Sequence, residues 1–331
     1  MTWYALDAID DAIDATRAFL WPFDRRRWAR LALVMLFVGG AGGFNPIQFP
    51  GGGTGGGVDT PTAPGTPDAI PSIGGPEVAV IAAIVGLVAL IVLGFMFVGS
   101  VMEFVFVESL RRDAVTVRRY WSERWRQGLR LFGFRLVLGV LTLGVVGGLV
   151  VAVLAPVVFG NGGFSFGLLL VAIPVFVVVS IVSGLVNGFT TMFVVPVMIA
   201  EERNVLSAWR RFWPTLTGQW KQYAVYAVMG FILQLAGGIL AGIATLIGIV
   251  VLAIPFGLVG LVGAGLLTVV DVVGWVVIGL AAVLFVLAAI VLVLFVSVPV
   301  QTFLRYYALL VLGDTNAEFD LIPEQRAAAQ E

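Results

Sequence analysis

The sequence predicts an all-α integral membrane protein with six transmembrane helices, arranged as three tandem repeats of an interfacial helix and a helical hairpin. Hydrophobic residues make up 60% of the 331-residue chain, charged residues make up only 12%, and the mean hydropathy is +1.05. Soluble domains contain about 45–50% apolar and about 25% charged residues, so this chain has too little charge to cover a water-facing surface. Several uncharged runs also exceed the ~20 residues that a helix needs to cross a bilayer.

The uncharged runs locate the membrane spans. Residues 78–102 predict one span, and residues 136–200 predict two spans with a Gly-rich turn around Gly160 between them. Residues 222–304 contain Asp271 as their only charge, and a short apolar stretch near the N-terminus adds a first span. We therefore expect spans at about 28–44, 78–107, 130–158, 168–199, 222–252 and 273–312, with a Gly- and Pro-rich outer loop at 45–77.

The basic residues predict the orientation of these spans. All 19 Lys and Arg residues lie in residues 17–30, 111–135 and 203–221 or at Arg305 and Arg326. The positive-inside rule places these positions, and with them both termini, in the cytoplasm. A third span between 222 and 304 would move Arg305 and Arg326 outside. We therefore expect two spans there, with residues 254–271 as an irregular or re-entrant outer segment.

This orientation divides the chain into three parts and places it in the cell membrane as a multi-pass protein. We expect an amphipathic interfacial helix at 1–23, a six-helix membrane domain at 24–313 and a cytoplasmic tail at 314–331. The N-terminal helix carries an apolar stripe of Leu6, Ile9, Ile13, Thr16 and Leu20 beside an acidic stripe of Asp7, Asp10, Asp11 and Asp14. Because the cytoplasmic leaflet is anionic, we expect this helix to dock against the basic segments of the protein; a solvated acidic face is the alternative.

Similar basic segments before the odd-numbered spans predict the tandem repeats. Trp21-Pro22 precedes Trp28 by the same spacing with which Trp213-Pro214 precedes Trp220. In the remaining segment, residues 118–121 match residues 210–213 in residue type. Because each unit would cross the membrane twice, the repeats are parallel, which argues against the inverted-repeat plan of many transporters.

The basic segments 17–30, 111–126 and 203–221, which we call the first, second and third elbows, combine arginine with tryptophan. Tryptophan prefers the headgroup level of a bilayer, and the arginine fork can bind phosphate, so the elbows predict contacts with lipid headgroups. Plain anchoring in the membrane is the simpler interpretation, because the positive-inside rule alone explains the arginines. The candidate headgroup contacts are Arg111, Arg112, Arg118, Arg119, Arg210, Arg211, Trp121 and Trp213.

Four polar residues of the predicted spans are further candidates, because polar and ionisable groups in lipid are costly and often functional. Glu103 and Arg135 lie near the cytoplasmic ends of their spans, where a gate or proton site competes with a structural ion pair. Asn187 and Gln234 lie deeper, and hydrogen bonding between helices is the simpler interpretation of both.

The composition argues against catalysis. The chain contains no histidine and no cysteine, which removes the usual general base, thiolate nucleophile and soft metal ligands. Residues 163–167 match the G-x-S-x-G motif, but that motif requires a histidine base and a strand–turn–helix context. The only lysine, Lys221, belongs to the opposite side of the membrane. We therefore expect no enzymatic activity, no cofactor and no metal.

Two stretches resemble known families. Residues 193–202 form an apolar span end with Pro196 and an acidic turn, and residues 205–213 follow as an Ala-Trp-Arg elbow. This pattern is similar to the membrane domain of glycerophosphodiester phosphodiesterases. The opening residues 5–13 and 19–23 resemble a family of haloarchaeal membrane proteins of unknown function. The resemblance implies a six-helix fold in the cytoplasmic membrane. It carries over no catalytic residues, because the phosphodiesterases hold their active site in a separate soluble domain.

Taken together, the sequence predicts a non-enzymatic multi-pass membrane protein that binds lipid headgroups or partner proteins through its Arg/Trp elbows. A small-solute or lipid transporter, with a path between the repeats, is the alternative. The expected partners are membrane lipids and a second copy of the chain or another membrane protein, and nucleic acid is not expected.

Overall fold

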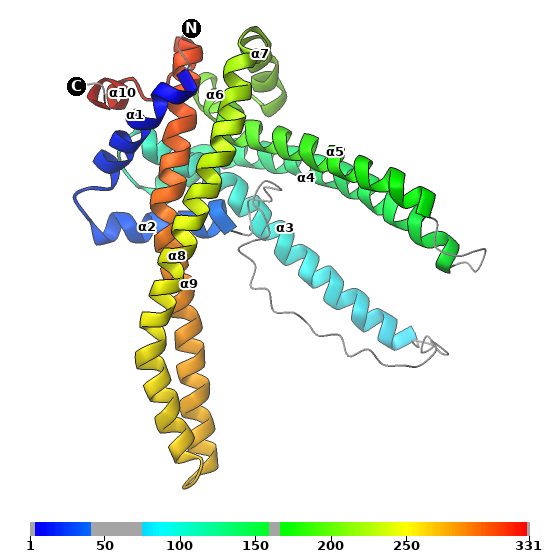
Figure 1. Cartoon of the computed structure of the whole chain (residues 1–331), viewed down its shortest axis with the longest axis vertical. Coiled ribbons are helices and arrows are strands. Elements are labelled where there is room, and N and C mark those ends of the chain that lie inside the picture. Colours follow the sequence, from blue (N-terminus) through cyan, green and yellow to red (C-terminus); the bar gives the residue numbers. More distant parts are fainter. Residues whose placement is uncertain (1–3, 41–74, 159–165, 330–331) are drawn as a thin grey trace.

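The computed structural model describes residues 4–40, 75–158 and 166–329, and every element within them is a helix (Figure 1). The all-α prediction is therefore confirmed for these residues. The expected outer loop at 45–77 and the motif at 163–167 lie largely outside them. The elements are α1 (Tyr4–Leu20), α2 (Arg25–Met35), the π-helix η1 (Leu36–Gly40), α3 (Gly75–Arg111), α4 (Val117–Val158), α5 (Phe166–Phe189), the π-helix η3 (Thr190–Val194), α6 (Val195–Glu201), α7 (Val205–Gly218), α8 (Trp220–Leu266), α9 (Asp271–Thr315), the 3₁₀ turn η4 (Ala317–Phe319) and α10 (Pro323–Ala329).

Five helical segments among the described residues are long and apolar enough to cross a membrane. Most of their apolar side chains are exposed in the monomer, as expected for surfaces that lie in lipid. Of the sixth expected span, at 28–44, α2 and η1 cover the part up to residue 40. The five segments are Val78–Arg111, Val117–Ala155, Gly167–Ala200, Trp220–Leu266 and Asp271–Thr315.

The outer segment at 254–271, which was expected to be irregular or re-entrant, is instead helical over most of its length, as a continuation of α8. Helix α8 continues through Pro255 to Leu266, and only residues 267–270 form the turn to α9. The expectation was wrong because a proline inside a membrane helix is tolerated when neighbouring structure compensates for the missing hydrogen bond. The result is a hairpin of two long helices.

Glycines let the two helices of this hairpin approach each other closely. A Cβ atom at Gly263 would lie 3.2 Å from the backbone nitrogen of Ile278, and one at Gly274 would lie 2.8 Å from the carbonyl oxygen of Gly263. Nearer the core, a Cβ atom at Gly237 would lie 2.8 Å from Val300. Helix α8 therefore packs against α9 along its length, from the tip inward.

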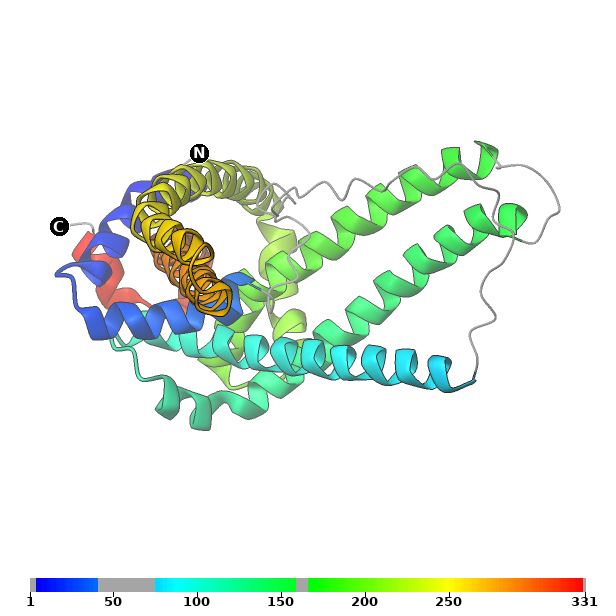
Figure 2. The same cartoon turned by 90° about the horizontal axis from the view of Figure 1, so that it is seen from below.

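The helices form three arms that diverge from one shared core. One arm is the α8/α9 hairpin, the second is the α4/α5 pair and the third is α3, and their outer ends point away from one another in both views (Figures 1 and 2). The core lies at the opposite ends, where residues 101–110, 193–199 and 304–312 are buried without interruption. The first two segments lead directly into the second and third elbows, and the last leads into the C-terminal tail.

Helix α1 docks onto this core through a face of small residues. Tyr307 of α9 donates a hydrogen bond to the carbonyl oxygen of Ala5 over 2.8 Å, and Phe19 packs edge-on against Tyr306. Helix α1 contacts mainly α9, and also α10 and α8, while Asp7, Asp10 and Asp14 of its acidic stripe are exposed, as the alternative of a solvated acidic face expected. The buried residues are Ala5, Ala8, Ala12, Ala15, Thr16, Phe19 and Leu20, whereas Leu6 and Ile13 of the predicted stripe are exposed.

The three elbows differ in local structure. Trp21-Pro22 lies between α1 and α2 and has a cis peptide bond, whereas Trp213-Pro214 lies inside α7. The second elbow is not a separate helix, because α4 runs without interruption from Val117 into its apolar part. Their sequence similarity therefore does not extend to a shared backbone conformation.

Candidate functional site

The core contains a buried cluster of polar and charged side chains from four different helices. Glu103 comes from α3, Arg135 from α4, Thr191 from η3 and Arg305 from α9. Their exposed fractions are 2%, 9%, 5% and 2%, so water has little access to any of them. We call these four residues the charge cluster. Each arm contributes to it, so the cluster marks the point where the arms meet.

Glu103 joins the two arginines. One of its carboxylate oxygens lies 3.4 Å from Nη2 of Arg135, and the other accepts a short hydrogen bond from Nη2 of Arg305. Thr191 is a second shared acceptor: its hydroxyl accepts from Arg135 Nη2 over 2.8 Å, and its carbonyl oxygen accepts from Arg305 Nη1 over 2.6 Å. The Arg305 guanidinium also lies 5.5 Å from the ring centre of Phe106. These contacts hold α3, α4, α9 and the α5–α6 junction together.

A π-turn positions the threonine of the cluster. Residues 190–194 form the π-helix η3 between α5 and α6, and such turns shift the register of the backbone and are frequent at functional sites. The hydroxyl of Thr190 donates to the Val186 carbonyl, and it accepts a 3.1 Å hydrogen bond from the Trp209 indole of α7. Helix α7 therefore supports the turn that presents Thr191.

The cluster carries more positive than negative charge. Two guanidinium groups face one carboxylate, and arginine is not deprotonated in proteins, so the side chains sum to one positive charge. Nη1 of Arg135 is buried and has no hydrogen-bond partner among the described residues. A buried charge without compensation is expensive in free energy, so the excess positive charge and the unpartnered nitrogen are both unusual in a protein core.

A second buried carboxylate, Glu108, is compensated separately. It lies one and a half turns after Glu103 on α3 and is fully buried. Nε of Arg112 lies 2.5 Å from it, Nη2 of Arg124 lies 3.5 Å away and Nη1 of Arg111 lies 4.0 Å away. The arginines of the second elbow that were predicted to contact lipid therefore partly serve the core of the protein itself.

The other predicted headgroup contacts fall into two groups. Nε of Arg119 lies 2.9 Å from Glu123, and Nε of Arg211 lies 3.1 Å from Glu201, while Arg211 also pairs with Glu318. The hydrogen bond to Glu201 raises the pKa of the Arg211 guanidinium. These pairs neutralise part of the elbow charge within the chain.

Arg118 and Arg210 form the second group, because both are exposed and neither makes an ion pair with any residue that the structure describes. Trp213 is exposed near Arg210, whereas Trp121 is half-buried and packs edge-on against Phe97. Further exposed basic side chains of the second and third elbows and of the adjoining part of α4, without a described acidic partner, are Arg126, Arg130 and Lys221, and Trp125 and Trp220 are exposed beside them.

The structure brings together only some of the predicted polar residues of the spans. Glu103 and Arg135 meet in the charge cluster, whereas Asn187 and Gln234 are half-buried outside it. Sequence reasoning missed Arg305, which it used only as a marker of orientation. The available signal for Arg305 was its position at the end of a long apolar run, where a charge is as costly as at Arg135.

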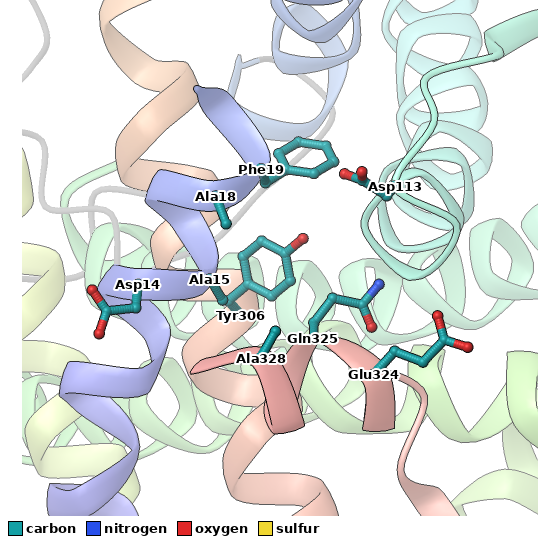
Figure 3. A pocket seen from close by; sticks show the side chains of 9 residues that line it. All are labelled: Asp14, Ala15, Ala18, Phe19, Asp113, Tyr306, Glu324, Gln325 and Ala328. Carbon is teal, nitrogen blue, oxygen red and sulfur yellow. The ribbon is translucent and has the colours of Figure 1, made fainter. Parts of the chain in front are cut away.

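A pocket of about 280 Å³ lies beside the core, between α1 and α10 (Figure 3). Side chains of α1, including Phe19, face Gln325 and Glu324 of α10, with the Tyr306 ring between the two helices. Asp113 at its edge forms an ion pair with Arg27, whose guanidinium stacks on Phe19. Among the residues that the structure describes, no three metal-ligating side chains lie together.

Of the comparisons with known proteins, only the one with protein families gave a match, and it covers nearly the whole chain. Neither the curated proteins nor the solved structures gave a match. A family of unknown function, DUF7544, matches residues 3–322, which include all three arms, the charge cluster and the elbows. The chain therefore belongs to the DUF7544 family.

Proposed function

We propose that this protein is a non-enzymatic multi-pass membrane protein that binds anionic lipid headgroups at the basic end of its core. The observation that carries the proposal is the division of the elbow arginines into paired and unpaired groups. Arg119 and Arg211 are neutralised by carboxylates of the chain, whereas Arg118 and Arg210 are exposed without such partners. An exposed guanidinium without an internal partner is free to bind a phosphate in two-point geometry.

The surroundings of these arginines support an interfacial position. Trp213 and Trp220 are exposed on the third elbow, and Trp125 is exposed on the second, where Arg126 lies over its ring. Exposed tryptophans next to arginines are typical of helices that lie at the level of the lipid headgroups. Each arginine near an anionic surface adds about 1 kcal/mol of attraction, so several together would hold anionic lipid.

The topology that belongs to this proposal has six crossings in three tandem units, with both termini on the cytoplasmic side of the cell membrane. It is supported by the placement of charge on the described helices. The second and third elbows begin at the inner ends of α3 and α6 and the first joins α1 to α2, whereas the outer ends of α4, α5 and α8 carry no basic residue. A single side of the membrane can therefore hold all of the elbows.

Native mass spectrometry of the detergent-purified full chain tests the proposed lipid binding. The double variant Arg118→Gln with Arg210→Gln should retain clearly less anionic lipid than the unchanged protein. The matched control is Arg119→Gln with Arg211→Gln, which removes the same charge from paired positions and should retain more lipid than the first variant. Equal retention by the unchanged protein and the Arg118/Arg210 variant would refute the proposal.

A small-solute or lipid transporter is the second candidate, and the buried charge cluster is the observation that favours it. Ionisable groups inside membrane domains often line transport paths. Proteoliposomes containing the full chain would then move a solute or a labelled lipid across the bilayer, and Glu103→Gln would abolish that movement. Movement equal to that in empty liposomes would remove this candidate.

A further inference from the structure

We propose that the charge cluster is a binding site for one phosphate-type oxyanion, held by the free side of the Arg135 guanidinium. The bound group is either the headgroup phosphate of a lipid or a phosphate ion from solution, and both offer the same recognition chemistry. The site is distinct from the exposed Arg118 and Arg210, so the proposal does not depend on the elbow arginines.

The first argument is charge. Within the part of the chain that the structure describes, Glu103 is the only carboxylate paired with Arg135 or Arg305, and it is in contact with both. The three side chains have exposed fractions of 9% or less, so water cannot screen the remaining positive charge well. Because neither guanidinium can lose its proton, an anion is the remaining way to neutralise the cluster.

The second argument is hydrogen bonding. Nη2 of Arg135 is engaged by Glu103 and Thr191, whereas Nη1 of the same guanidinium is buried without any partner in the described residues. Thr302 provides a second such atom: its hydroxyl is fully buried and unpartnered, and it lies one turn before Arg305 on α9. Buried polar atoms are nearly always satisfied in native proteins, so unpaired donors next to an excess charge indicate a missing acceptor.

The third argument concerns the kind of anion. The planar arginine fork matches the spacing of phosphate oxygens, and hydrogen bonds between ionised partners are about twice as strong as neutral ones. A phosphodiester carries one negative charge and would balance the one positive charge of the cluster. The cluster lies towards the inner ends of the arms, the end of the molecule that carries the second and third elbows, and basic elbows are expected at the level of the lipid phosphates.

Thermal unfolding of the purified, delipidated full chain tests the free-ion source. At constant ionic strength, added inorganic phosphate should raise the unfolding midpoint in a saturable manner, because a ligand that binds only the folded state stabilises it. Arg135→Gln should lose this rise. The matched control is Arg130→Gln, an exposed arginine of the same helix, which should keep it.

Nanodiscs test the lipid source. The protein is reconstituted in phosphatidylcholine alone or in phosphatidylcholine with phosphatidylglycerol, and bound lipid is counted by native mass spectrometry. If a headgroup occupies the site, Arg135→Gln should release one tightly held phosphatidylglycerol that the Arg118/Arg210 double variant retains. Loss of lipid in the double variant alone would support the proposed surface binding and count against the buried site.

The two experiments distinguish a lipid headgroup from a free phosphate ion, and both from the absence of a site. A response to phosphate or to phosphatidylglycerol that disappears in Arg135→Gln supports the site and names its source. No response in either arm, or an equal response in Arg135→Gln, overturns it. If Arg135→Gln does not fold, Arg135→Lys provides the test. Lysine keeps the positive charge but lacks the forked guanidinium, so the affinity for the anion should fall severalfold. An unchanged affinity would overturn the proposal.

Discussion

At the scale of single residues, the core depends on charges that compensate one another inside an apolar environment. Glu103 is in contact with two arginines and is 2% exposed. A buried ion pair adds little net stability, but the removal of one partner leaves the other charge buried and unpaired. The carboxylate of Glu103 therefore matters more for stability than its single charge suggests.

Glu103→Gln should destabilise the protein by about 3–5 kcal/mol, because two guanidinium groups would then be buried without a carboxylate. The unfolding free energy of the detergent-solubilised chain measures this loss. Glu202→Gln is the control, since this carboxylate is mostly exposed and its ion pair with Arg124 is long, and it should change stability very little. A Glu103→Gln variant as stable as the Glu202→Gln variant would show that the charge cluster does not hold the core together.

The sequence predicted part of this cluster. Glu103 and Arg135 could be identified because charges are rare in their spans, and an ion pair between them was one of the interpretations. Arg305 could not be placed, because an arginine at the end of an apolar run has the same pattern whether it extends to the headgroups or turns into the core. Thr191 depends on a π-turn, and no residue pattern in 190–194 predicts one.

At the scale of elements, small residues determine where helices meet. A Cβ atom at Gly128 of α4 would lie 2.8 Å from the Cα atom of Val101 on α3, so this glycine marks the crossing of two arms. Two glycine pairs that match the G-x-x-x-G pattern of close helix packing, Gly144/Gly148 and Gly238/Gly242, have open space around them in the monomer instead. Motif spacing alone therefore did not identify the crossing point.

Gly128→Ala should destabilise the chain by about 1–3 kcal/mol, since the backbone of Val101 cannot move aside without separating α3 from α4. Unfolding in detergent again provides the measurement. Gly139→Ala on the same helix meets nothing within 4 Å and should be neutral or slightly stabilising. If both substitutions change the unfolding free energy equally, α3 and α4 do not approach each other closely at Gly128.

Helix α1 offers a second element-scale prediction, because it is held by an alanine face. Ala12 is fully buried against the core, whereas Ile13 is exposed. Ala12→Leu should loosen the helix and increase hydrogen exchange of the α1 amides severalfold, while Ile13→Ala should leave their exchange unchanged. Equal protection in both variants would contradict the docking of α1 through this face.

The apolar stripe of α1 misled the sequence analysis for a physical reason. Large apolar residues predict a buried face on a soluble protein, but at a membrane interface they can face lipid while alanines pack against the protein. The lipid environment also explains why the prolines at 174, 255 and 299 did not end their helices. In lipid, the backbone has no water to bond with, so helices continue through residues that would end them elsewhere.

At the scale of the whole molecule, three apolar arms share one core at their basic ends. The long apolar runs predicted membrane helices, and five segments of sufficient length and hydropathy are present in the described residues. The divergence of the arms could not be predicted, because apolar side chains surround each arm and do not indicate which side faces another helix. Helices α1, α6 and α7 and the inner end of α9 lie at the same end of the molecule (Figure 1).

The side of the membrane on which this core lies is the most direct test of the proposed organisation. The chain has no cysteine, so single cysteines at Ala327 on α10 and at Asp271 at the tip of the α8/α9 arm can be labelled in intact cells with a membrane-impermeant maleimide. A cytoplasmic core predicts labelling at 271 and protection at 327 until the membrane is opened. Labelling of 327 in intact cells would contradict the placement of the core, the elbows and both termini in the cytoplasm.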